Sequence, residues 1–244
     1  MAAARRGEQP NPARHPFATD VDKYYTIGFG GAPGPAARAR MWLLDSDFHV
    51  VACFRASQAA RRLFSQSKLL GILPMLAAGM WRRRMATIHH VEIDRRAKIG
   101  PGFFVMHRNG IFIGPITIGA NCVLHHNVTI GQRVAAGDQG VPRLGANVWI
   151  GPGATISGDI TIGNGVTISA GSVVSKSVPD GALVAGNPGR VIALDYDNSA
   201  MLNYTVAEPA TAPPESPAES PAESPAETQP PWTARLAQPT RIRA

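Results

Sequence analysis

The chain has 244 residues, 44% of them hydrophobic and 17% charged, and this composition is typical of one globular domain with appendages. The net charge of +7 comes mostly from scattered arginines without interleaved aromatic residues, which disfavours nucleic-acid binding. Because no apolar run reaches about 18 residues, no secretory signal is recognisable and only two cysteines are present, we expect a cytoplasmic protein without a transmembrane helix.

The N-terminal third of the chain reads as an arm followed by helices. Residues 1–35 are rich in Ala, Arg, Pro and Gly, so we expect a disordered arm there. Residues 36–90 are predicted to form a helical lead-in, with one helix starting at the N-cap Ser46 and a second within residues 68–85, bent or broken near Pro74. Two such helices bury little surface between themselves, so they must pack on the rest of the chain.

A six-residue rhythm of aliphatic side chains then governs residues 91–195. Its positions are Ile93, Ile99, Val105, Ile111, Ile118, Leu124, Ile130, Leu144, Ile150, Ile156, Ile162, Ile168 and Val174, with one extra residue between Ile111 and Ile118. A period of six fits neither an amphipathic helix nor an alternating strand, but it fits a solenoid with three flat faces and about eighteen residues per coil. Gly often follows the aliphatic residue, where we expect its unusual backbone angles to permit a tight corner.

Two segments do not follow the rhythm. Residues 133–143, RVAAGDQGVPR, have the composition of an exposed loop, and loops on repeat scaffolds commonly carry function. Residues 196–244 contain the repeat ESPAESPAESPAE, which has no apolar face, so we predict a disordered tail. Such a tail is a candidate for docking an unknown partner.

Five segments carry motifs that go beyond the rhythm: EIDRRAKIGPG (92–102), MHRNGIFIG (106–114), NVTIG (127–131), ANVWIGPGATISGDITIGNGVTISAGSVVSK (146–176) and AGNPGRVI (185–192). They resemble the hexapeptide-repeat acyltransferases, specifically the serine acetyltransferase-like branch. The resemblance implies a mainly β fold, a left-handed parallel β-helix, that assembles as a homotrimer. It also implies an acetyl-CoA-dependent O-acetyltransferase with active sites between subunits, no metal, and a small-molecule or glycan acceptor.

The resemblance places the chemistry in the polar interruption at residues 106–110. The family's general base is a His followed two or three residues later by a Gly, a pattern that falls on His107 and Gly110. An imidazole suits removal of a hydroxyl proton at neutral pH. The branch's acidic partner stands fifteen residues earlier, on Glu92, where a carboxylate would hold the ring and stabilise its protonated form. Arg108 and Asn109 are candidates for acceptor binding. The alternative is a surface imidazole at a corner and a solvated carboxylate at an edge.

Seven further residues match the family's contacts to acetyl-CoA: Gly131, Gln132, Gly151, Pro152, Ala170, Lys176 and Arg190. The resemblance implies that the backbone N–H groups of the first two donate to the developing oxyanion, that the next three line the pantetheine arm, and that the two cations face the nucleotide phosphates. Cys122 occupies a small inward position of its hexad and is predicted to belong to the core. Direct transfer within a ternary complex is therefore favoured over an acetyl-enzyme intermediate.

The resemblance does not extend to the residues that bind the acceptor. Serine-specific members carry an Asp immediately before the catalytic His and Arg-His before the Pro of the loop. This chain has Met106 at the first place and Gly140-Val141 before Pro142 at the second. Without polar groups that grip an ammonium and a carboxylate, a sugar, polysaccharide unit or natural product is favoured as acceptor, with serine left open.

Two other classes of function remain open. His89, His107 and His126 recur about one coil apart, so stacked imidazoles would bind zinc as in the carbonic anhydrases built on this solenoid, although a second His of those enzymes falls on Ala120. The other possibility is a non-catalytic scaffold that uses its C-terminal tail for interaction.

Overall fold

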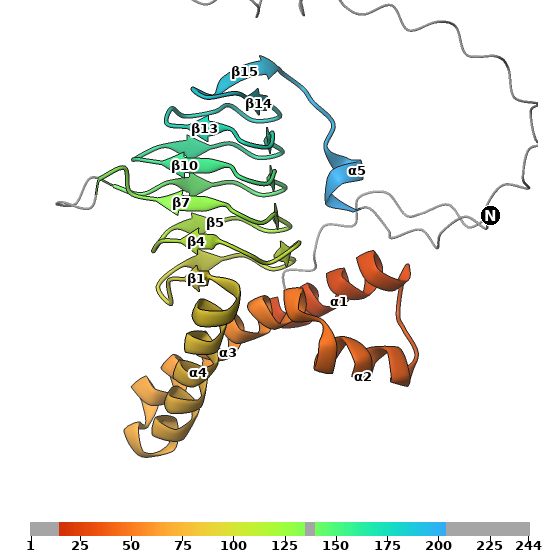
Figure 1. Ribbon diagram of the computed structural model, residues 1–244, viewed down its shortest axis with the longest axis vertical. Coiled ribbons are helices and arrows are strands. Elements are labelled where there is room, and N and C mark those ends of the chain that lie inside the picture. The colour runs from red at the N-terminus through yellow and green to blue at the C-terminus, as the bar shows by residue number, and fades with distance from the viewer. Residues whose placement is uncertain (1–14, 135–139, 204–244) are drawn as a thin grey trace, which may run out of the picture. The chain divides into compact units, whose positions relative to one another are not determined.

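The computed structural model describes residues 15–134 and 140–203 (Figure 1). Four helices come first: α1 Pro16–Phe29, α2 Pro35–Leu44, α3 Ser46–Gln66 and α4 Lys68–His89. Fifteen strands and a short helix α5, Ser199–Leu202, follow. The ESPA repeat and the rest of the predicted tail from residue 204 onward lie outside the described residues.

The strands are short, and each contributes one side of a coil. They are β1 Val91–Ile93, β2 Lys98–Ile99, β3 Phe104–Val105, β4 Ile111–Ile113, β5 Thr117–Ile118, β6 Val123–Leu124, β7 Thr129–Gly131, β8 Arg143–Leu144, β9 Trp149–Ile150, β10 Thr155–Ser157, β11 Thr161–Ile162, β12 Thr167–Ile168, β13 Val173–Val174, β14 Leu183–Ala185 and β15 Arg190–Ala193.

Three parallel sheets form the sides of a triangular prism. Sheet A has the order β1-β4-β7-β10-β13, sheet B has β11-β8-β5-β2, and sheet C has β15-β14-β12-β9-β6-β3, in which only β15 pairs antiparallel. Every aliphatic position of the predicted rhythm points inward and is no more than 8% exposed. The predicted left-handed parallel β-helix is thus confirmed, because each inward side chain stacks on its counterpart one coil away, as Ile130 does on Ile156.

One coil departs from the predicted spacing. Ile113, and not Ile111, is in register with Ile93 on one side and Ile130 on the other. The interval from Val105 to Ile113 is therefore eight residues and that from Ile113 to Ile118 is five, whereas we expected six and seven. The corner before β4 consequently holds two residues more than a standard hexad, and this longer corner contains the polar residues 107–109.

The glycines that follow the aliphatic residues serve a different purpose from the one expected. Gly119 and Gly151 do not have left-handed backbone angles. A Cβ at Gly119 would collide with the backbone of Gly145 in the next coil, and one at Gly151 would collide with the backbone of Ala170. Glycine is required there because successive coils approach closely. The left-handed angles occur elsewhere in the corners, for example at Asn127 with φ 56°.

The first helix lies where we expected a disordered arm. Residues 16–29 form α1, which buries Tyr24 and Ile27. The hydroxyl group of Tyr24 accepts a hydrogen bond from the N–H of Val105 (3.1 Å) and lies 3.2 Å from the carbonyl oxygen of the same residue. Tyr24 thereby satisfies backbone groups of β3, the last strand of sheet C.

The later helices follow the prediction with two differences. The N-cap of α3 is Asp45, whose Oδ1 accepts the N–H of Phe48 at 2.9 Å, and not Ser46. Helix α4 continues through Pro74 to His89 without a break. Among the described residues, no helix combines the length and apolar character needed to cross a membrane.

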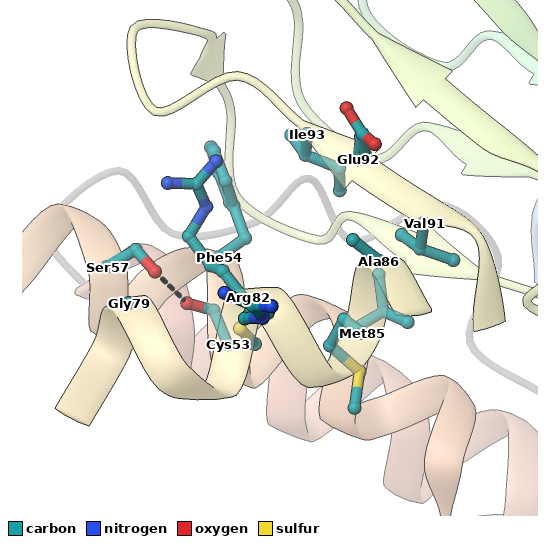
Figure 2. Close-up of a pocket in the computed structure, with 12 residues that line it drawn as sticks. Cys53, Phe54, Ser57, Gly79, Arg82, Met85, Ala86, Val91, Glu92 and Ile93 are labelled. Carbon is teal, nitrogen blue, oxygen red and sulfur yellow. Dashed lines mark hydrogen bonds between the residues drawn. The ribbon is translucent and has the colours of Figure 1, made fainter. Parts of the chain in front are cut away.

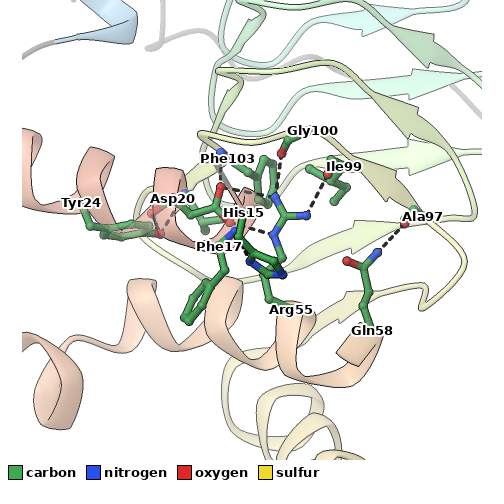
Figure 3. A network of polar contacts seen from close by, with 11 residues as sticks. His15, Phe17, Asp20, Tyr24, Arg55, Gln58, Ala97, Ile99, Gly100 and Phe103 are labelled. Atoms are coloured by element: carbon green, nitrogen blue, oxygen red, sulfur yellow. Dashed lines mark hydrogen bonds and ion pairs between the residues drawn. The ribbon is translucent and has the colours of Figure 1, made fainter. Parts of the chain in front are cut away.

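A buried ion pair fastens the helices to the first coil (Figure 3). The Nε of Arg55 in α3 donates to Asp20 in α1 at 2.7 Å, and its two terminal nitrogens donate to the carbonyl oxygens of Ile99 and Gly100 at 2.8 and 2.7 Å. The other oxygen of Asp20 accepts the N–H of Phe103 at 2.9 Å. Since both charges are buried and each nitrogen of the guanidinium and each oxygen of the carboxylate makes a hydrogen bond, the network fixes the helices on the solenoid.

Replacing Arg55 with alanine is expected to lower the free energy of unfolding by about 3–5 kcal/mol, because the Asp20 carboxylate would stay buried without its partner. Denaturant unfolding measures this loss. Gln58→Ala is the matched control, since Gln58 on the same helix gives up a single hydrogen bond to Ala97 and should cost only about 1 kcal/mol. Equal losses in the two variants would contradict the assigned role of the ion pair.

Candidate active site

The long corner that carries His107 is held by a carboxylate from α3. His107 has φ 55°, a left-handed conformation that is costly for a residue with a Cβ. Its N–H donates to Oδ2 of Asp47 at 2.9 Å, and the N–H of Arg108 donates to Oδ1 at 2.9 Å. The guanidinium of Arg108 also reaches Oδ1, at 3.2 Å. Asp47 therefore sets the backbone from which the predicted base projects.

His107 belongs to a cluster of three imidazoles. Its ring centroid lies 6.3 Å from that of His125 and 6.0 Å from that of His126, both in the equivalent corner of the next coil. His125 packs edge-on against Trp149, with centroids 4.9 Å apart. His107 is exposed and thus accessible to a ligand, while the Nδ1 of His126 is buried without a hydrogen-bond partner among the described residues.

Burial lowers the pKa of His125 to about 4, with a further contribution from the neighbouring His107 and His126. His125 is therefore neutral at pH 7.

The depressed pKa of His125 predicts a loss of stability in acid. In the unfolded chain His125 binds a proton near pH 6.5, whereas in the folded chain it does so only near pH 4. The contribution of neutral His125 to the free energy of unfolding is therefore complete above pH 6.5 and is lost as the pH falls toward 4. After allowance for solvent screening, we expect the free energy of unfolding to fall by about 1–2 kcal/mol across this pH range. Denaturant unfolding of wild type and His125→Leu, above and below this window, measures it. The variant should lose less stability, and an identical pH dependence would contradict the assignment.

The residues predicted to line the pantetheine arm continue the edge of the prism on which His107 lies. Gly151, Pro152 and Ala170 occupy the equivalent corners of the following coils. The backbone shows this stacking directly, because the N–H of Gly153 donates to the carbonyl of His126 at 3.0 Å and that of Gly171 donates to Pro152 at 2.8 Å. The candidate base and one side of the predicted cofactor path therefore share one edge, between sheets C and A.

A second group lies on the next edge, between sheets A and B. Gly131 ends β7, Gln132 follows it, and Lys176 follows β13. From Asn127 on the first edge to Gln132 on the second the chain advances by five residues, a span of about 16 Å when extended. On a single chain the two groups therefore do not meet. Arg190 is exposed at the start of β15, beside Ala185. The N–H of Gly189, directly before it, donates to the carbonyl of Val173 at 2.8 Å, so Arg190 lies at the C-terminal end of the first edge.

Glu92 lies outward on β1 in sheet A, between the two edges. It lines a groove of about 1220 Å³ together with Phe112, Gly131, Gln132 and Val141. Within the described ranges no hydrogen bond or ion pair joins the Glu92 carboxylate to His107. The structure thus brings Glu92 together with the oxyanion candidates, and it does not bring Glu92 into contact with the base.

A smaller cavity of about 260 Å³ lies between α3, α4 and β1 (Figure 2). Glu92 lines its rim, and the carboxylate points away from the side chains of Cys53 and Met85. Burial raises the pKa of Cys53 to about 11, and that of Cys122, which is 1% exposed as predicted for a core residue, also to about 11. Both thiols are protonated at neutral pH, which disfavours an acetyl-enzyme intermediate on either cysteine.

Sequence reasoning missed Asp47 and His125, whereas it did place His126 about one coil from His107. Asp47 is sixty residues from His107, and only its position in the first turn of α3 distinguished it. In the sequence, the only sign of His125 was that it and His126, two polar residues, directly follow the aliphatic position Leu124. The zinc hypothesis gains no support, because among the residues described no group of three or more His, Cys, Asp or Glu side chains is arranged to hold a metal ion.

Comparison with known proteins agrees with this geometry. The family described as bacterial transferase hexapeptide (six repeats) matches residues 142–176. Serine acetyltransferase of Helicobacter pylori is 32% identical over 166 residues, covering 66% of this chain and 91% of that protein. Serine acetyltransferase of Synechococcus elongatus is 37% identical over 161 residues, covering 65% of this chain and 62%, less than two thirds, of the relative.

Solved structures give the same result. The crystal structure of serine acetyltransferase from Brucella abortus superposes with a TM-score of 0.58 at 30% identity, over 73% of this chain and 67% of that one. The crystal structure of the Neisseria gonorrhoeae enzyme in complex with serine superposes with a TM-score of 0.57 at 28% identity, over 72% of this chain and 67% of that one. Fold and repeats thus define a hexapeptide-repeat transferase. Within that class, the chain belongs to the serine acetyltransferase family, as its motifs predicted.

Proposed function

We propose that this chain transfers an acetyl group from acetyl-CoA to a hydroxyl group, with His107 as general base. The observation that carries the proposal is the exposed imidazole of His107 on the same edge as Gly151, Pro152 and Ala170, in a chain of this family. In the reaction the acceptor oxygen bonds to the thioester carbonyl carbon while its proton passes to His107. The carbon–sulfur bond then breaks, and the departing CoA thiolate takes the proton.

The assembly proposed for this reaction is a homotrimer with sites between subunits. The span of about 16 Å between the two edges of one chain supports it, because a neighbouring copy is needed to place Gly131 and Gln132 beside His107. Backbone N–H groups at Gly131 and Gln132 would then face the developing oxyanion, and Lys176 and Arg190 would face phosphates. Glu92 lines the same groove as Gly131 and Gln132, so its proposed role toward the base also requires the neighbouring copy. Arg108 and Asn109 keep their proposed roles toward the acceptor.

The acceptor proposed is a sugar or another hydroxyl compound without amino-acid charges. Met106 and Val141 support this choice, since both put apolar side chains where serine-specific relatives have polar ones, and Val141 lines the groove beside Glu92. Serine is the second candidate, favoured by the names of the relatives and by the Neisseria gonorrhoeae complex.

An acceptor screen tests the proposal. Release of free thiol from acetyl-CoA is followed with serine, homoserine and a panel of sugars, using wild type and His107→Ala. We expect a sugar to exceed serine by at least about tenfold in kcat/KM. A preference for serine would reverse the acceptor assignment and leave the acetyl transfer intact, whereas thiol release that does not depend on His107 would contradict the proposed base.

A further inference from the structure

Helix α4 turns its large apolar side chains away from the protein. Its buried residues are small or lie at its end: Gly71, Ala78 and Met85, spaced seven apart along one line of the helix. Gly71 lets α4 approach α3 so closely that a Cβ there would collide with the backbone of Phe64. The narrow inner face therefore accounts for the packing of α4 without using its leucines.

The opposite face carries a stripe of exposed leucines. Leu69, Leu73, Leu76 and Met80 recur at intervals of four, three and four residues, and their side chains are between 59% and 85% exposed. Leu70 and Ile72 widen the stripe. A contiguous apolar surface of this kind on an otherwise polar exterior is typical of an interaction site.

The same hairpin is strongly cationic. Between Asp47 and Glu92 the sequence contains no Asp or Glu. Over this interval α3 and α4 carry six cations besides the buried Arg55: Arg61, Arg62, Lys68, Arg82, Arg83 and Arg84. Lys68 and Arg84 mark the two ends of the leucine stripe, and both are exposed. The surface thus combines an apolar centre with positive charge at each end.

Charge decides between a second copy of the chain and a lipid surface as occupant. If two α4 helices met along the stripe, a parallel arrangement would set Arg83 and Arg84 against the same residues, and an antiparallel one would set them against Lys68. Either contact brings like charges together without a carboxylate to neutralise them. A bilayer surface with anionic headgroups supplies both an apolar interior and the opposite charge.

We propose that α4 docks this protein on a bilayer surface that contains anionic lipids. The helix lies along the surface, since no described helix has the character needed to cross a membrane. The leucine stripe enters the boundary between headgroups and acyl chains, and the long side chains of Lys68 and Arg84 extend to phosphate groups at either end. This inference is independent of the proposed acetyl transfer.

Co-sedimentation of the full chain with vesicles tests the proposal. Vesicles of phosphatidylcholine mixed with phosphatidylglycerol should bind the protein at least about tenfold more tightly than phosphatidylcholine alone, because each cation near the surface contributes about fivefold. Added salt should weaken binding. Leu73→Glu should reduce it at least about tenfold, since the change removes apolar area and adds a charge that the headgroups repel.

Leu194→Glu is the matched control, because Leu194 is 63% exposed and follows β15 at the other end of the solenoid. It should bind like wild type, and circular dichroism should show both variants folded. The proposal is overturned if wild type binds neither vesicle, if it binds both equally, or if the two variants lose binding alike. Sedimentation velocity without lipid gives a further test, since a smaller species for Leu73→Glu would mean that a second copy covers the stripe.

Discussion

Replacement of His107 with alanine is expected to lower the turnover of acetyl transfer by about a hundredfold or more while acetyl-CoA still binds. The variant lacks the group that removes the hydroxyl proton, whereas Gly151, Pro152 and Ala170 on the same edge are unchanged. Thiol release measures turnover, and calorimetric titration with CoA measures binding.

His90→Ala is the matched control for this experiment. His90 is also exposed and also adopts a left-handed conformation, with φ 52°, but it ends α4 and lies outside the imidazole cluster. Its turnover should stay within about twofold of wild type, as for most surface substitutions. If His107→Ala retained full activity, a scaffold without catalysis at this corner would be the better interpretation.

Replacement of Asp47 with alanine is expected to lower turnover by between about tenfold and a hundredfold, although Asp47 is a positioning residue that does not touch substrate in the proposed reaction. Its two oxygens hold the N–H groups of His107 and Arg108. Without them the left-handed corner relaxes and the imidazole moves. Steady-state kinetics should show the loss in kcat, with the KM for acetyl-CoA little changed.

Two companion variants separate positioning from stability. Asp47→Asn keeps one acceptor oxygen and should fall between wild type and Asp47→Ala in kcat. Asp45→Ala removes the N-cap of the same helix, costs about 1 kcal/mol of stability and leaves the corner in place, so its kcat should be near that of wild type. A drop in kcat as large in Asp45→Ala as in Asp47→Ala would show that helix stability, and not the corner, controls turnover.

The solenoid was predictable because each six-residue unit contains one inward-facing aliphatic side chain and consecutive units repeat this pattern along the sequence. The exact shape of the catalytic corner was not, since six plus seven and eight plus five residues give the same distance from Val105 to Ile118. Only pairing of Ile113 with its neighbours reveals where the extra residues lie. The composition of residues 1–35 likewise concealed α1, whose apolar positions were averaged with those of the flanking Pro-rich segments.

Contacts between distant parts of the chain are the other feature that the sequence could not predict. Asp47 reaches the corner of His107 only after α3 docks on the first coil, and this docking depends on the ion pair of Arg55 with Asp20. No spacing rule links residues so far apart in sequence. The same limit applies to the separation of the candidate site into two edges, which follows from the width of sheet A and not from any motif.

The connection between Gln132 and Arg143 joins β7 to β8, two strands whose positions are fixed independently. Ile130 is in register with Ile156, and Leu144 is in register with both Ile118 and Ile162. Because strand pairing holds both ends, the register of β7 and β8 does not depend on the length of the connection between them. A redesign of this connection can therefore change the part of the groove that Val141 lines while the corner of His107 keeps its backbone geometry.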